Sequence, residues 1–146
     1  MTGDWLELSD LILDVGPPGE RRPVRKRAVL DRVATGRVAF GARRVIEALP
    51  ERDGGFLDEA AVDDTLIGAH LELQRLSQEF RQGPRLAGTL RPMFHALRDA
   101  KAAPLRLIDL GCGVGYALRW LAAREALGKD IELIGADFNP ALLGLA

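Results

Sequence analysis

The sequence has little of several features, and each shortage excludes a class of protein. Its 146 residues include one cysteine, Cys112, so an internal disulfide is excluded and a reducing, cytoplasmic compartment fits. No apolar run approaches the roughly 18 to 20 residues of a membrane-spanning helix. The N-terminal residues lack the positive charge and the small-residue cleavage pattern of a secretory signal. We therefore expect a cytoplasmic protein without a membrane span.

An excess of charge of one sign is also lacking. Twenty basic residues against twenty-one acidic ones give a net charge of -1, which argues against a whole surface built to neutralise phosphates. Five basic residues cluster between Arg21 and Arg27. This run is either a phosphate-binding arm or a solvated approach to the following helix. We favour the second, because no aromatic residue alternates with the charges as base stacking requires.

The composition, 47% hydrophobic and 28% charged, is that of a globular domain, and the pattern changes near Pro104. Apolar residues recur at helical spacing before Pro104, whereas short β-type runs surround one helix after it. The prediction is an α/β chain with two regions. Residues 1–103 form a helical N-terminal region, and residues 104–146 begin a Rossmann-like sheet in the order β-α-β-α.

Four helical segments are expected in the N-terminal region. The first covers about fifteen residues and ends at Gly16-Pro17-Pro18-Gly19, and the second spans 27–49 with Gly36 and Gly41 as weak points. A loop over 50–55 precedes the third. The fourth covers about 86–97, where Pro92 predicts a kink or two short helices. The third begins near residue 58 and carries an apolar stripe of Val62, Leu66, Ala69, Leu73, Leu76 and Phe80.

Two histidines, His70 and His95, lie in these helical segments. Each could act as a metal ligand or a catalytic base. Neither has a second histidine or a carboxylate at a convincing metal-ligand spacing. We therefore expect both on a helix surface or in packing, we predict no metal site, and we assign no catalytic residue.

The last forty residues carry the pattern with chemical content. A buried strand over 105–110 runs into the loop Gly111-Cys112-Gly113-Val114-Gly115, a helix follows, and a second strand ends at Asp137. Asn139 and Pro140 then supply the N-cap and first-turn proline of another helix. In a right-handed crossover the carboxyl ends of both parallel strands meet at one edge. Asp137 is therefore expected to face the glycine loop across a ligand crevice.

This geometry predicts an adenosine-type cofactor. Glycine tolerates the sharp turn from strand to helix and lets a ligand approach the backbone, while a carboxylate can accept hydrogen bonds from both ribose hydroxyls. The dinucleotide fingerprint G-x-G-x-x-G would need its third glycine at position 116, which is Tyr116. Asp109, just before the loop, would oppose a phosphate but suit a cationic ligand.

At these residues the chain resembles the class I, Rossmann-like S-adenosylmethionine-dependent methyltransferases. Residues 107–115 are similar to the first motif of that family, and residues 134–140 to its second. The resemblance implies S-adenosyl-L-methionine as cofactor. It implies that Gly111, Gly113 and Gly115 wrap the methionine and ribose parts, that Asp109 holds the ammonium, that Asp137 holds the ribose hydroxyls, and that Phe138 borders the adenine. Cys112 lies inside this site; we interpret it as a small loop residue rather than a nucleophile, because no partner activates it.

The family fold has a seven-stranded sheet, of which this sequence supplies two strands. We therefore expect the N-terminal portion of a longer enzyme, with the 146-residue chain by itself inactive and its cofactor binding weak or undetectable. The less favoured expectation is a shortened relative whose sheet is completed by another chain. Two other functions stay open: a NAD(P)- or other nucleotide-binding Rossmann oxidoreductase, and a non-catalytic helical interaction module that retains half of a Rossmann unit.

The methyl acceptor is not indicated by any motif. The near-neutral charge favours a small molecule, with nucleic acid or protein as alternatives. The N-terminal helices resemble, in placement only, the lids and dimerisation segments of such enzymes, so a homodimer through them is a further expectation.

Overall fold

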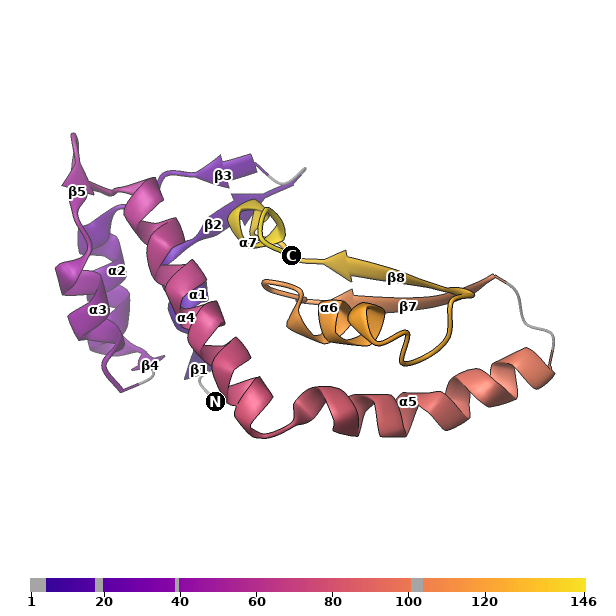
Figure 1. The fold of residues 1–146 in the computed structure, drawn as a ribbon. Coiled ribbons are helices and arrows are strands. Elements are labelled where there is room, and N and C mark those ends of the chain that lie inside the picture. Colours follow the sequence, from indigo (N-terminus) through magenta and orange to yellow (C-terminus); the bar gives the residue numbers. More distant parts are fainter. Residues whose placement is uncertain (1–4, 18–19, 39, 101–103) are drawn as a thin grey trace. The chain divides into compact units, whose positions relative to one another are not determined.

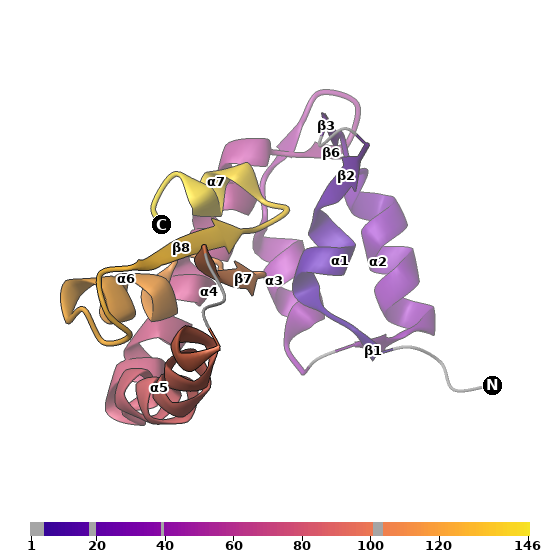
Figure 2. The ribbon, with the colours of Figure 1, turned by 90° about the vertical axis from the view of Figure 1, so that its right-hand side faces the viewer.

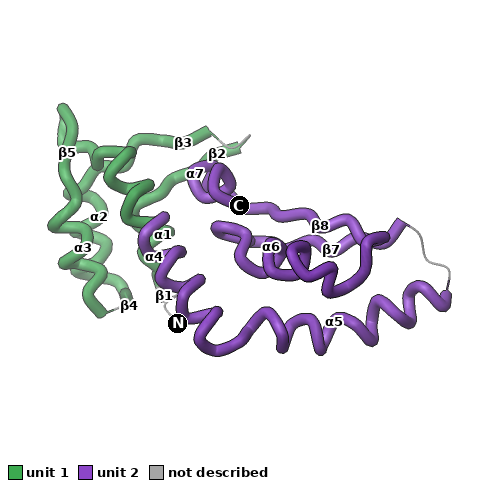
Figure 3. The backbone as a smooth tube through the Cα atoms, in the orientation of Figure 1, with its two compact units in different colours: residues 1–66 green, residues 67–146 purple. Residues whose placement is uncertain are grey.

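The structure, a computed structural model, describes residues 5–17, 20–38, 40–100 and 104–146 and is mixed α/β (Figure 1). It has two compact units, Met1–Leu66 and Ile67–Ala146, which Figure 3 colours separately. The division lies inside a long helix, well before the change of pattern near Pro104. Residues 101–103, at the predicted boundary, are outside the described residues. Among the helices described, none is long and apolar enough to cross a membrane.

Among its described residues, the first unit contains three short helices and the start of a long one. These are α1 (Leu8–Ile12), α2 (Lys26–Thr35), α3 (Ala42–Ala48) and the first part of α4 (Glu59–Glu79). α1 lies beside α2, and α2 lies beside α3 (Figure 2). Their apolar residues form one core, which comprises Leu11, Ile12, Leu13, Val29, Val33, Ile46, Leu49, Leu57, Val62 and Leu66.

The helix predicted over 27–49 is two helices. Gly36 is the C-cap of α2, and Gly41 is the N-cap of α3 in the left-handed conformation, with φ 89°. Between them, strand β4 (Arg37–Val38) pairs in parallel with β1 (Trp5–Leu6). Because glycine is costly inside a helix and adopts positive φ freely, both predicted weak points are complete breaks.

The prediction of a helix over the first fifteen residues and of a loop over 50–55 was wrong in part. α1 has five residues and lies between β1 and β2 (Asp14–Gly16), which pairs antiparallel with β3 (Glu20–Arg22). Pro18 and Gly19 of the predicted breaker are outside the described residues. The second segment contains strand β5 (Glu51–Arg52) and the turn of a hairpin, whose other strand is β6 (Phe56–Leu57). Strands this short leave no periodic pattern in a sequence.

The second unit contains the β-α-β order that the sequence predicts. After the rest of α4 come α5 (Gln82–Asp99), β7 (Leu105–Leu110), α6 (Tyr116–Ala123), β8 (Ile131–Ala136) and α7 (Pro140–Leu143). β7 and β8 pair in parallel, from Leu105 with Ile131 to Leu110 with Ala136. Asn139 caps α7 as expected, because its side chain accepts a 3.0 Å hydrogen bond from the Ala141 N–H.

Helices α5 and α6 cover one face of the β7–β8 pair (Figure 1). This packing explains why α5 belongs to the second unit. α5 continues through Pro92 as one helix, so the alternative of two short helices was wrong. Trp120 of α6 packs on Gly83 of α5, where any Cβ would overlap the indole ring. The shared core comprises Ala87, Phe94, Leu105, Leu121, Ala126 and Leu127.

The apolar stripe predicted along α4 is buried only in its first half. Val62 and Leu66 belong to the core of the first unit, whereas Leu73, Leu76 and Phe80 are 56%, 45% and 63% exposed. The half-buried positions of the second half are Ile67, His70, Gln74 and Ser77. The helix therefore turns a mainly polar row inward after Leu66.

Candidate functional site

The loop 111–115 joins β7 to α6 at the carboxyl ends of the two paired strands. Its three glycines have positive φ: 76° at Gly111, 53° at Gly113 and 70° at Gly115. The N–H groups of Gly111 and Cys112 donate to the carbonyl oxygen of Ala136 at 2.7 and 3.1 Å, which fixes the loop to the end of β8. Because other residues are strained at these angles, the backbone itself requires the three glycines.

Asp137 follows β8, and its carboxylate contacts the loop directly. One oxygen, Oδ2, accepts a 2.8 Å hydrogen bond from the N–H of Gly113, and Oδ1 accepts a 2.9 Å bond from the N–H of Asn139. The structure therefore brings together the two features that the sequence placed on opposite sides of a crevice. An ionised carboxylate has about four lone-pair sites, so Asp137 retains acceptor capacity for a ligand.

Cys112 is half-buried in the loop. Its sulfur fits over Gly135 of β8, where a Cβ would lie 2.9 Å from Sγ. Burial raises the pKa of the Cys112 thiol, and the nearby carboxylates of Asp137 and Asp109 raise it further. A thiol that stays protonated is a poor nucleophile, so this environment agrees with its interpretation as a small loop residue.

A cavity of about 250 Å³ opens beside the loop, within the second unit. This volume is below the about 300–1,000 Å³ of drug-sized pockets, so the cavity suits one polar portion of a larger ligand. Its lining on the loop side is Asp109, Gly111, Cys112, Val114, Tyr116 and Ala117, and on the helical side His70, Leu73, Gln74, Ser77 and Gln82. Gly113, Gly115, Asp137 and Phe138 lie outside this lining, and the Phe138 side chain is 58% exposed.

His70 lies against the glycine loop, which its sequence context did not indicate. A Cβ built on Gly113 would be 2.5 Å from Nδ1 of His70, so only glycine leaves room for the imidazole. His95, in contrast, is exposed on α5 and pairs with Asp99 at 3.2 Å, in agreement with a surface role. The helical spacing of the polar residues His70, Gln74 and Ser77 could have indicated this inward face. The apolar spacing of Leu73 and Leu76 favoured a different face.

The environment of Asp109 and Tyr116 bears on the choice between cofactors. Asp109 lines the cavity, so a pyrophosphate bound there would face a carboxylate. Tyr116 is the first residue of α6 and lines the same cavity, where the dinucleotide fingerprint has its third glycine. The carboxylate of Asp109 favours a ligand with a positive group near the loop, and Tyr116 departs from the dinucleotide fingerprint.

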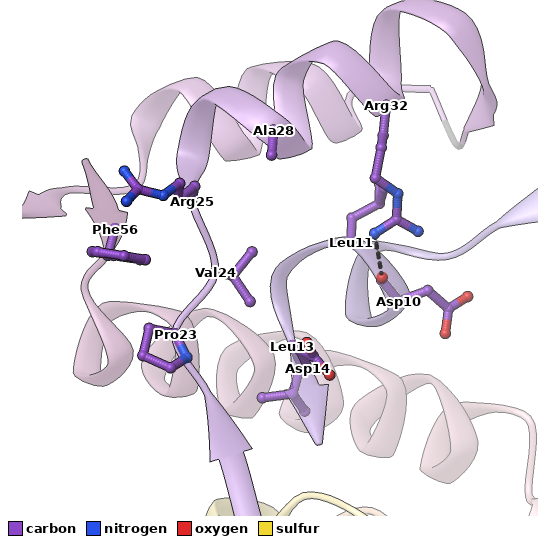
Figure 4. Close-up of a pocket in the computed structure, with 10 residues that line it drawn as sticks. All are labelled: Asp10, Leu11, Leu13, Asp14, Pro23, Val24, Arg25, Ala28, Arg32 and Phe56. Carbon is purple, nitrogen blue, oxygen red and sulfur yellow. Dashed lines mark hydrogen bonds between the residues drawn. The ribbon is translucent and has the colours of Figure 1, made fainter. Parts of the chain in front are cut away.

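A second cavity, of about 560 Å³, lies in the first unit (Figure 4). Arg25 lies beside Phe56 at one end of it, and Arg32 lies beside Asp10 at the other. Arg25 lies 4.4 Å from the centre of the Phe56 ring, and Arg32 donates to the carbonyl oxygen of Asp10 at 3.3 Å. Both arginine side chains therefore already contact other groups of the chain.

Side chains of the basic run 21–27 likewise pair with groups of the chain itself. Arg21 pairs with Asp63 at 2.7 Å, and Arg27 pairs with Asp31 at 3.2 Å. Lys26 is mostly buried and donates to the carbonyl oxygens of Glu47 and Leu49 near the end of α3. The run leads into α2, as favoured, and several of its side chains hold the first unit together rather than lying free in solvent.

No family model, curated protein or solved structure matches this chain.

Proposed function

We propose that the chain contains the S-adenosylmethionine site of a class I methyltransferase. The observation that carries the proposal is the placement of two carboxylates around one glycine loop. Asp109 is the penultimate residue of β7 and lines the cavity, and Asp137 follows β8 and accepts a hydrogen bond from Gly113. Two acidic groups at the ends of adjacent parallel strands suit a ligand with a cationic end and a ribose.

The residues present fit each part of this cofactor. Asp109 would hold the ammonium, and its charge would favour the nearby positive sulfonium. Gly111 and Cys112 line the cavity. Asp137 has acceptor capacity left for the ribose hydroxyls, and Phe138 offers an exposed ring to the adenine. Bound there, the cofactor supplies an electrophilic methyl group.

The chain's own part in methyl transfer is binding and orientation. The loop is tied to β8 and the residue after it by hydrogen bonds to Ala136 and Asp137, which would help to orient a ligand that it holds. Such positioning is a major source of rate in a displacement between two bound reactants. We propose a small molecule as the methyl acceptor, and no described residue is assigned as a base.

Equilibrium dialysis with labelled S-adenosylmethionine at high protein concentration tests the proposal. We expect binding by the wild-type chain and about a tenfold or greater loss in Asp109→Asn, which removes the charge opposite the ammonium at constant volume. Asp99→Asn, on the exposed side of α5, is the matched control and should leave binding unchanged. Absence of binding, or tighter binding of NADH than of S-adenosylmethionine, would overturn the proposal.

A further inference from the structure

We infer that the polar row of α4, His70 with Gln74, is a carboxylate-recognition wall for the amino-acid end of the ligand. The inference rests on the proposed function and adds residues from outside the sequence motifs to its site. The row faces the loop across the 250 Å³ cavity, so one small ligand group can touch both walls.

The two walls differ in charge. The loop side contributes the carboxylate of Asp109, whereas the α4 and α5 side contributes a histidine, two amides and a hydroxyl from His70, Gln74, Gln82 and Ser77. An anionic wall opposite a wall of hydrogen-bond donors is complementary to a zwitterion, with the ammonium toward Asp109 and the carboxylate toward the helix.

The orientation of Gln74 is fixed by its neighbour. Oε1 of Gln74 accepts a 2.8 Å hydrogen bond from Nη2 of Arg119. Arginine has donors only, so the oxygen must face Arg119 and the amide N–H groups are left to donate elsewhere. Gln74 lines the cavity, where these donors suit a carboxylate.

His70 offers the second donor. Its ring packs on Gly113 and lines the cavity. Within the part of the chain that the structure describes, neither ring nitrogen has a hydrogen-bond partner, so the imidazole N–H is available to a ligand. Contact with the loop backbone also places His70 beside the segment that would hold the rest of the cofactor.

The test compares two ligands that differ in the amino-acid end. S-adenosylhomocysteine carries the zwitterion, and 5′-methylthioadenosine has the same thioether and adenosine without it. We expect His70→Ala to weaken S-adenosylhomocysteine binding about tenfold to a hundredfold and to leave methylthioadenosine unchanged, since a hydrogen bond to a charged group is lost. His70→Gln, which retains an N–H donor, should recover most of the affinity.

A second variant keeps the test decisive if His70→Ala unfolds. Gln74→Glu preserves the acceptor for Arg119 but turns a carboxylate oxygen toward the ligand, so it should repel S-adenosylhomocysteine and spare methylthioadenosine. His95→Ala, on the exposed face of α5, is the control and should change neither affinity.

The outcomes separate the two proposals. Wild-type binding of both ligands, with equal losses or no loss in the variants, would overturn the carboxylate wall and leave the proposed function standing. Failure of the wild-type chain to bind either ligand would overturn both. A selective loss for S-adenosylhomocysteine supports the wall.

Discussion

The carboxylate of Asp137 accepts a 2.8 Å hydrogen bond from the backbone N–H of Gly113, which joins the end of one strand to the loop that follows its neighbour. The other oxygen, Oδ1, accepts a hydrogen bond from the backbone N–H of Asn139. Asp137 is thus a structural anchor of the loop in addition to its proposed role toward a ribose. A binding defect in an Asp137 variant must therefore be compared with its stability.

Replacing Asp137 by alanine should lower the free energy of unfolding. Two backbone N–H groups lose a charged acceptor, which costs about 2 kcal/mol. Urea unfolding followed by circular dichroism measures the change. Asp99→Ala, at an exposed position, should stay within about 0.5 kcal/mol of the wild type. Equal stability of both variants would show that the Asp137 anchor is weak.

The raised pKa of Cys112 predicts a slow reaction with thiol reagents at neutral pH. Only the thiolate reacts, and burial together with Asp137 and Asp109 disfavours the thiolate. The alkylation rate should rise with pH and level off above the pH of an ordinary thiol. Asp109→Asn should shift the rate profile to lower pH. An unperturbed profile in the folded chain would contradict the environment described for Cys112.

Three helical glycines should respond to alanine in opposite directions. Gly68 of α4 and Gly88 of α5 face open space, so alanine should raise the free energy of unfolding by about 0.5–1 kcal/mol at each. Gly83 touches the Trp120 indole, so alanine there should destabilise the chain by about 1–3 kcal/mol through overpacking. Thermal unfolding distinguishes the cases. Stabilisation by Gly83→Ala would refute the packing of α5 on α6.

The pair Arg98 and Asp130 predicts an acid-sensitive contribution to stability. Nε of Arg98 donates to Asp130 at 2.7 Å, and this hydrogen bonding lowers the pKa of the Asp130 carboxyl. The contribution is present above the ordinary aspartate pKa and is lost as pH falls through the lower folded value. The melting temperature of Asp130→Asn should thus be below the wild type at pH 7 and converge with it in acid. Asp64→Asn, at an exposed position of α4, should show no such convergence.

The sequence predicted the second unit better than the first for a physical reason. Residues 105–140 carry strong local signals: two six-residue strands rich in apolar residues, three glycines with positive φ and an Asn-Pro helix start. In the first unit, the strands have two or three residues, which is too short for a periodic pattern. β2–β3 and β5–β6 are local hairpins, whereas β1 and β4 pair across a long distance in the chain. The β1–β4 pair depends on tertiary contacts, which local pattern does not report.

The candidate site was predictable on the strand side only. The positions of Asp109, the loop glycines and Asp137 follow from the β-α-β order. The contribution of His70 depends on the rotation of α4 about its axis, and the apolar residues Leu73 and Leu76 pointed to a different inward face. The rotation of α4 after Leu66 is set by its tertiary packing. Periodicity alone therefore predicted the wrong inward-facing residues for the second half of the helix.

The most direct measurement of the central claim is a titration of the isotopically labelled chain with S-adenosylhomocysteine, followed by amide NMR shifts. The account predicts saturable shifts concentrated at residues 109–115, at Asp137 and Phe138, and on α4 around His70, with NADH producing smaller shifts at the same concentration. Absence of shifts at the loop, or shifts confined to residues of the first unit, would contradict it.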